Sequence, residues 1–240
     1  DLQPHYYYGY YGNNIPLETA RDILRIARRD EDLAHANYIM AMTARNGGSA
    51  ELRVRAADYF EAALKAGKRS PWYDDALWFY AQWMESQGKI VPVEGGGWSH
   101  MPDAVKGLEL YRRLIREFKQ GETRHYRAAQ NQIKRITAEQ LGVGVGNVFV
   151  PGSVIKYHLN WRNVGKVRLA LYPLDLGKDL SGSRYAKDNG NWLGALDAGG
   201  RPSLKAWDFE TEDNGDHQPG RKNLELEGRL AAGAYLLTAT

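Results

Sequence analysis

Two hydrophobic periods divide the sequence near residue 141. Before this point, apolar residues recur every three or four positions, the spacing of one helix face, as in residues 33–43. After it, apolar and polar residues alternate, as in residues 155–162, which is the spacing of a strand with one buried face. We therefore predict an α+β chain with a helical domain over residues 1–140 and a β-domain over residues 141–240.

Six helical runs are bounded by residues that start or stop helices. Pro16 suits the first helical position, and Ser49 has the side chain to cap the run that follows it. Gly47 and Gly88 end the runs before them. The predicted helices cover residues 16–27, 33–43, 49–64, 71–84, 102–118 and 126–136.

The helices form pairs that repeat along the chain. The residue types of the pair Tyr59 and Ala76 recur together 52 residues later. The second pair is Tyr111 and Ala128. The arrangement resembles the tetratricopeptide pattern, whose period is about 34 residues, and an insert at residues 89–101 accounts for the longer shift. The resemblance implies an α-helical solenoid of stacked hairpins with one continuous core.

The alternating half predicts antiparallel strands joined by turns. Tyr157, Trp161 and Tyr235 are expected to fill the space between two sheets. Residues 176–202 are rich in Gly, Asp and Asn, which predicts a long loop with room for a short helix. This pattern is typical of an immunoglobulin-like antiparallel β-sandwich. The predicted strands lie at residues 155–162, 167–172, 204–209, 224–226 and 234–239.

Three short motifs follow one another in the β half. They are Pro151–Gly152–Ser153, then Trp161–Arg162–Asn163–Val164 with Leu171–Tyr172, and last Gly233–Ala234–Tyr235–Leu236. In this order they resemble a macroglobulin domain of the bacterial alpha-2-macroglobulin family, which has such a turn, hairpin and closing strand. Large bacterial members of that family also carry helical repeats ahead of their macroglobulin domains.

The resemblance implies a role without catalysis. Members of the family enclose proteases in cages of stacked macroglobulin domains, and many carry a Cys-Gly-Glu-Gln thioester that couples to the protease. The chain has no cysteine and therefore no such thioester. We expect the N-terminal portion of a large exported protein of the bacterial periplasm or cell surface, with proteins, proteases among them, as partners. No cofactor and no small-molecule substrate are expected.

Charge and composition disfavour two other classes. Lys and Arg total 32 and Asp and Glu total 29, a net charge of +3, and neither half carries a basic excess that would bind nucleic acid. No apolar run reaches the ~18 residues of a membrane helix. The lack of cysteine also removes disulfides, thiol catalysis and thiolate metal sites.

Motifs for cofactors, metals and hydrolysis are incomplete. The glycines of residues 142–146 lack the spacing of a dinucleotide fingerprint and follow a helix instead of preceding one. The acidic residues within 208–217 are spaced imperfectly for a calcium loop and indicate a solvated loop. Asp74 and Asp75 stand at a helix start, where carboxylates favour the helix dipole, and the six histidines form no metal-ligand motif. We interpret these groups as structural.

Trp98 and His100 are the candidate binding residues. They lie in a glycine-rich insert between helical repeats, where a solenoid can carry a functional loop. We predict that they contact a protein partner; the alternative is that the insert folds back on the helix surface. A second irregular segment, the tyrosine-rich arm at residues 6–12, either packs on its own domain or docks on a partner.

Two other functions fit the sequence. A stand-alone adaptor of the cell envelope would bind a protein or peptide with its helices, and its reading frame would stop near Thr240. A carbohydrate-binding module would use the 7 Trp and 15 Tyr residues on a β-sandwich, and glycans would change its tryptophan fluorescence.

Overall fold

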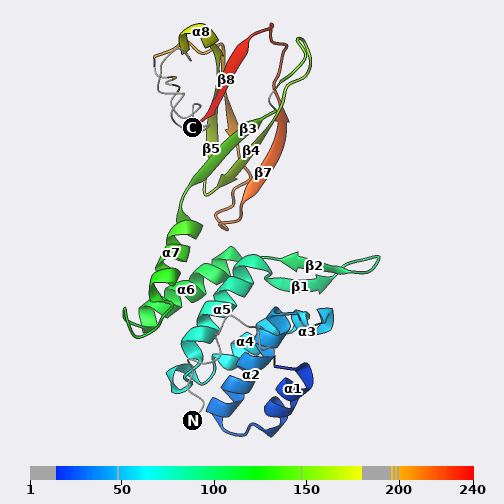
Figure 1. Cartoon of the computed structure of the whole chain (residues 1–240), viewed down its shortest axis with the longest axis vertical. Helices are drawn as coiled ribbons and strands as arrows, with labels where there is room; N and C mark the ends of the chain where they lie inside the picture. The colour runs from blue at the N-terminus through cyan, green and yellow to red at the C-terminus, as the bar shows by residue number, and fades with distance from the viewer. Residues whose placement is uncertain (1–14, 48, 147, 180–195, 197, 199) are drawn as a thin grey trace. The chain divides into compact units, whose positions relative to one another are not determined.

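The chain divides into two compact units, Asp1–Thr137 and Ala138–Thr240 (Figure 1). The computed structural model describes residues 15–47, 49–146, 148–179, 196, 198 and 200–240. The first unit holds helices and a two-stranded sheet, and the second holds two three-stranded antiparallel sheets and a short helix. The fold class is therefore mixed α+β. Within the described ranges, each helix is too short or too polar to span a lipid bilayer.

The helices of the first unit follow the predicted runs with one interruption. They are α1 (Leu17–Ile26), α2 (Asp30–Arg45), α3 (Ala50–Val54), α4 (Ala56–Ala63), the 3₁₀ turn η2 (Gly67–Arg69), α5 (Tyr73–Ser86), α6 (Ala104–Glu117) and α7 (Tyr126–Thr137). The predicted run 49–64 breaks at Arg55, which separates α3 from α4. Ser49 caps α3 as expected, because its Oγ accepts a hydrogen bond from the Leu52 N–H at 3.4 Å.

Small and aromatic side chains build the core of the helical unit. Helix α5 packs against α4 and α6, and its residues Ala76, Leu77 and Ala81 are fully buried. Small residues at these positions let the neighbouring helices approach closely. Phe60 of α4 stacks on Tyr80 of α5 with their ring centroids 5.4 Å apart.

Two details of the predicted helix faces are wrong. Leu33 is 36% exposed, because α2 begins at Asp30 and turns its alanine-rich face, with Ala34 and Ala41, into the core. On α7 Ala129 lies on the inward face as its helical spacing predicts and is fully buried, but Ala128, the small residue expected at the helix crossing, is only partly buried. The repeat of small residues therefore lies one position from where the sequence pattern places it.

The second unit is built from six antiparallel strands. They are β3 (Gln140–Val145), β4 (Lys156–Arg162), β5 (Lys166–Leu174), β6 (Lys205–Glu210), β7 (Gly220–Glu225) and β8 (Ala234–Ala239). One sheet has the order β3-β4-β7 and the other the order β6-β5-β8. Asn163, with a positive φ of 55°, lies in the turn that joins β4 to β5.

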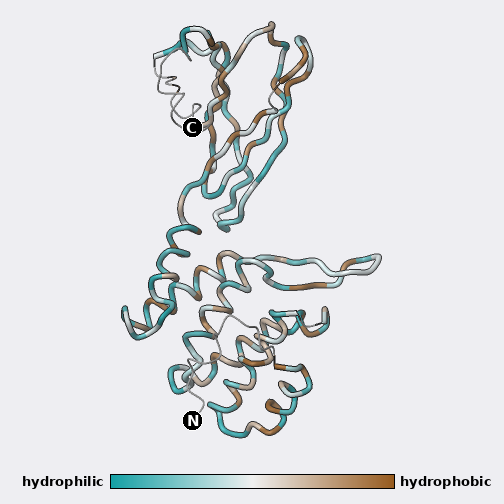
Figure 2. The backbone as a smooth tube through the Cα atoms, viewed as in Figure 1, coloured by the Kyte–Doolittle hydropathy of each residue, from teal (hydrophilic) through white to brown (hydrophobic). Residues whose placement is uncertain are grey.

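Both sheets contribute to one core. Figure 2 shows hydrophobic residues, in brown, along the strands of this unit. Leu159 of β4 and Leu169 of β5 are fully buried, and Trp161 of β4 approaches Phe209 of β6 with ring centroids 5.9 Å apart. Tyr157 and Tyr235 pack into the same cluster. The residues of this cluster define the face of each sheet that is buried from water.

Two of the glycines in residues 142–146 lie in a paired strand and not in a phosphate loop. Gly142 and Gly144 lie within β3, a strand that the sequence pattern did not delimit. Gly144 pairs with His158, and a Cβ built on it would lie 2.3 Å from the His158 ring. Glycine therefore makes room for an imidazole against the backbone of the neighbouring strand.

Two predicted segments fall outside the described residues. They are the tyrosine-rich arm at residues 6–12 and residues 180–195 of the predicted long loop. The loop does begin with a short helix, α8 (Leu176–Asp179). Arg201 pairs with Asp179 at 2.6 Å and ties the end of α8 to the segment that leads into β6.

Candidate functional site

The insert at residues 89–101 forms a β-hairpin, whose first strand packs against the helices at Ile90. Strand β1 (Lys89–Pro92) pairs antiparallel with β2 (Trp98–Met101). In this register Pro92 lies opposite Trp98, and Ile90 lies opposite His100. Figure 1 shows the hairpin extending from the helices of its unit.

The glycines of this segment lie at the tip and at the root of the hairpin, where the backbone has a positive φ. Gly95, Gly96 and Gly97 at the tip all have positive φ, between 88° and 100°, a region that favours glycine. At the root, Gly88 has a φ of 61°, and a Cβ built on it would lie 1.7 Å from the Met101 carbonyl oxygen. The backbone crosses there too closely for any side chain.

The root of the hairpin is held by the helical core. Ile90 of β1 is buried among the core residues of the helices. The Trp83 indole N–H, at the end of α5, donates to the Gly88 carbonyl at 3.0 Å. These two contacts attach the start of the hairpin to the helical core.

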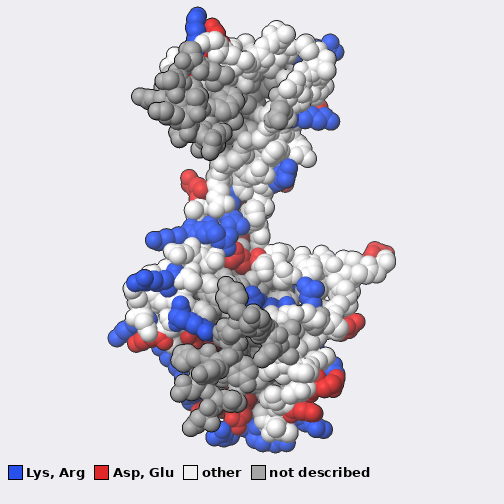
Figure 3. Space-filling view, viewed as in Figure 1, with Lys and Arg blue, Asp and Glu red and all other residues white. Residues whose placement is uncertain are grey.

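Both sequence-predicted site residues lie on β2. Because side chains alternate along a strand, Trp98 and His100 share one face, and both are exposed, Trp98 at 41%. Val93 and Met101 are exposed apolar neighbours, at 42% and 55%. Figure 3 shows an acidic group at the end of the hairpin. The exposed groups of the hairpin are thus apolar side chains, the His100 imidazole and the edge of a strand.

A buried ionic cluster, absent from the sequence-based prediction, lies elsewhere in the helical unit. Asp75 of α5 and His125, just before α7, are more than nine-tenths buried. His125 Nε2 and Arg124 Nη2 each lie 2.6 Å from Asp75 Oδ1. The His125 ring stacks on Trp78 with their centroids 5.1 Å apart. We call Asp75, Arg124 and His125 the buried ionic cluster after its two buried members, Asp75 and His125; the Arg124 side chain is 42% exposed.

The metal-binding alternative for this cluster is disfavoured by its charge. Asp74, Asp75 and His125 can place one ligand atom each within 4.8 Å of one another, and within the described ranges they are the one such group of three. However, the Arg124 guanidinium already occupies the Asp75 oxygen that a cation would need. We therefore interpret the cluster as a set of polar contacts that stabilises the packing of α5 against the segment before α7.

Three buried tyrosines donate their hydroxyl protons to glutamates on neighbouring helices. The acceptors of Tyr80, Tyr73 and Tyr111 are Glu61, Glu117 and Glu85, at 2.8, 2.8 and 3.3 Å. Burial, followed by the adjoining carboxylate, raises the pKa of all three, that of Tyr73 to about 12. These contacts join helices, so they belong to the core and not to a site.

We expect the helical unit to lose stability as pH rises from 10 to 12. The neutral hydroxyl is favoured in the fold, so its contribution is fully present below the ordinary tyrosine pKa of 10.0 and is lost as pH rises through the folded value, about 12 for Tyr73. Urea unfolding followed by circular dichroism measures the loss. Tyr73→Phe should make the decline shallower, and Tyr126→Phe on α7 should leave it unchanged. An equal decline in both variants would contradict the assignment.

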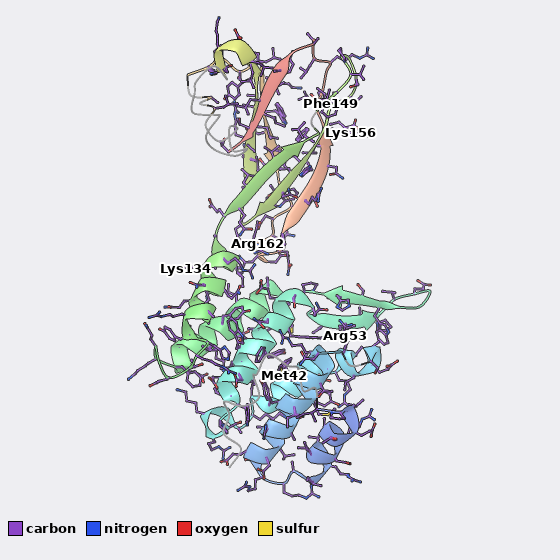
Figure 4. All side chains as sticks on the ribbon, in the orientation of Figure 1. Met42, Arg53, Lys134, Phe149, Lys156 and Arg162 are labelled. Carbon is purple, nitrogen blue, oxygen red and sulfur yellow. The ribbon has the colours of Figure 1, made fainter. Side chains whose placement is uncertain are left out.

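The second unit contains an apolar cavity of about 580 Å³. Val145, Phe149, Leu226 and Tyr235 are among the lining residues, and Figure 4 shows Phe149 at the same end of the unit as Lys156, where β4 begins. Tyr235 donates its hydroxyl to the Ala231 carbonyl at 3.1 Å. The lining therefore offers packing surface more than reactive groups.

Asp208, Asp213, Trp161 and Trp207 of the second unit make structural contacts. Asp208 lies on β6, where Lys166 and Arg168 of β5 hold its carboxylate by hydrogen bonds and lower its pKa. Asp213 accepts the Val164 N–H at 3.3 Å. Trp161 and Trp207 both pack into the core, so these two rings form no exposed platform for a sugar.

The chain has no match among known proteins in three comparisons. No protein-family model, no curated protein and no solved structure matches it. Function is therefore inferred from the residues and their geometry.

Proposed function

We propose that the chain is a non-catalytic, protein-binding N-terminal portion of a large exported bacterial alpha-2-macroglobulin-like protein that traps proteases. The observation that carries the proposal is where the resembling motifs lie in the second unit. Gly152, with a φ of 76°, lies in the turn after Pro151. Asn163 lies at the corner between β4 and β5, and Tyr235 lies on β8. Each motif thus occupies a turn or core position of the β unit, which supports the proposal.

A macroglobulin-type β-sandwich is the fold that we propose for the second unit. Two three-stranded sheets contribute to one cluster of buried residues, as the facing sheets of a sandwich do. Tyr157 of β4 meets Trp207 of β6 edge to face across this cluster, with ring centroids 6.4 Å apart. Aromatic pairs of this kind fill the space between two sheets.

For the first unit we propose a short solenoid of tetratricopeptide-like hairpins. α2 packs on α4, α5 on α6, and α6 on α7. Tyr59 on α4 and Tyr111 on α6 are both buried, in agreement with the 52-residue repeat. One cluster of core residues runs from α1 to α7, as in a stack of repeats.

The proposed role assigns the protein to the bacterial periplasm or cell surface. There it would meet proteases that attack the cell envelope. The helical unit would contribute a protein-binding surface, and the β unit would begin the stack of macroglobulin domains.

We expect proteases mixed with the full-length parent protein to be bound and slowed. The parent and protease should comigrate in size-exclusion chromatography, and cleavage of a protein substrate should fall. The 240-residue chain alone is the matched control, because one β unit cannot enclose a protease. Proteases that stay free and fully active in the presence of the parent would contradict the inhibitor role.

A stand-alone envelope adaptor is the second candidate. The observation in its favour is the hairpin β1–β2, whose exposed Trp98 and Met101 suit contact with another protein. The two candidates differ in gene length, because the adaptor requires a stop codon near Thr240.

A further inference from the structure

The hydrogen-bonding pattern of the hairpin identifies which backbone groups face outward. The Val93 N–H donates to the Gly97 carbonyl at 3.3 Å, so this closing pair is hydrogen-bonded. Hydrogen-bonded and non-hydrogen-bonded pairs alternate in an antiparallel ladder. Pro92 and Trp98, the next pair, are therefore non-hydrogen-bonded, and their backbone groups point away from the hairpin.

The same pattern repeats two positions further along each strand. Ile90 and His100 form the second non-hydrogen-bonded pair, so their backbone groups also point outward. The outer edge of β1 thus presents Ile90 and Pro92, and the outer edge of β2 presents Trp98 and His100. Within the described ranges, β1 and β2 pair with no further strand.

The two edges differ in their capacity to accept another strand. On β1, Pro92 has no N–H, Lys89 adds a charge, and the strand lies against α3. Proline and lysine are the residues that proteins use to protect an edge. On β2, Trp98 and His100 each keep one N–H donor and one carbonyl acceptor, and both side chains are exposed. Only the β1 edge is protected.

We propose that the outer edge of β2 binds an extended segment of a partner protein, which adds to the hairpin as a third strand. The backbone of Trp98 and His100 would supply the hydrogen bonds, and the Trp98 ring would cover an apolar side chain of the segment. This inference rests on the proposed protein-binding function and names the form of the partner, an extended strand with an apolar residue opposite Trp98.

A linear segment fits this edge better than a second copy of the chain. β2 has the four residues of Trp98–Met101, and two of them face outward. A stable dimer interface buries about 1,200–2,000 Å², which pairing of two such short edges does not reach. A peptide strand needs only the edge and the Trp98 contact.

Dodecapeptides selected from a random phage-displayed library on the complete 240-residue chain are the probe. We expect the selected peptides to alternate apolar and polar residues and to bind with an affinity measurable by fluorescence anisotropy. His100→Pro removes the outward N–H while the inward hydrogen bonds of β2 remain, and it should weaken binding about tenfold. His100→Ala is the matched control and keeps the N–H, so it should bind much more tightly than His100→Pro.

A change on the peptide tests the same pairing without altering the protein. Methylation of alternate backbone nitrogens in the peptide should also weaken binding about tenfold for the register that faces β2. Equal binding by His100→Pro and His100→Ala, insensitivity to methylation in both registers, or failure to select any peptide would overturn the proposal. So would sedimentation of the chain as a dimer that His100→Pro dissociates.

The outcomes also separate this inference from the proposed function. Protease trapping by the parent without peptide binding at β2 would overturn the strand-addition proposal alone. Peptide binding at β2 without protease trapping would overturn the inhibitor role and leave the strand-addition site in place.

Discussion

Replacement of Asp75 by asparagine is expected to lower the free energy of unfolding of the helical unit by about 2–3 kcal/mol. The carboxylate of Asp75 accepts hydrogen bonds from His125 and Arg124, each at 2.6 Å, within a largely buried site. Asparagine keeps the size of the side chain but removes its charge, so a guanidinium loses its buried counter-charge. Urea unfolding followed by far-ultraviolet circular dichroism measures the change.

Asp74→Asn is the matched control for Asp75→Asn. Asp74 precedes Asp75 in the first turn of the same helix, so both variants lose the same favourable charge near the helix N-terminus. Asp75 is buried, with 6% of its surface exposed, whereas Asp74 is only partly buried. We expect Asp74→Asn to cost at most about 1 kcal/mol. Equal stabilities of the two variants would show that the buried ionic cluster does not stabilise the helical unit.

Replacement of Gly88 by alanine is expected to destabilise the chain by about 2–5 kcal/mol. Its positive φ of 61° strains any residue with a Cβ. In addition, the new Cβ would lie 1.7 Å from the backbone oxygen of Met101, so one strand of the hairpin must move. The free energy of unfolding gives the cost, and faster hydrogen exchange at Ser99 and Met101, whose N–H groups face β1, reports the displacement of β2.

Gly67→Ala separates backbone strain from the close approach. Gly67 has nearly the same φ, 57°, but no atom lies within 4 Å of a Cβ built on it. We expect Gly67→Ala to cost only the strain of the left-handed conformation, about 1–2 kcal/mol. If Gly88→Ala is no more destabilising than Gly67→Ala, then the hairpin root is not the tight crossing that we describe.

Helices were predictable from the sequence because long periodic runs determine them. The run that became α5 has every expected inward residue buried, from Tyr73 to Met84. The hairpin was not predictable because its strands have only four residues each, with Pro92 in one of them. Three glycines between the strands indicate a loop, and nothing in the local pattern indicates that the flanking residues pair.

The two kinds of candidate site were not equally visible in the sequence. Trp98 and His100 stand out locally, because an aromatic ring and an imidazole are unusual in a glycine-rich insert. Asp75 and His125 are 50 residues apart, and only the packing of α7 against its neighbours brings them together. The same holds for the tyrosine–glutamate contacts, such as Tyr73 with Glu117. No spacing motif exists for contacts that depend on tertiary structure.

The size of the native gene product tests the central claim most directly. An antibody raised against this chain would be used to blot extracts of the cells that produce it. If the chain is part of a large macroglobulin-like protein, the band will be several-fold heavier than the 27.1 kDa of the chain. A single band near 27.1 kDa would contradict that account and favour the stand-alone adaptor.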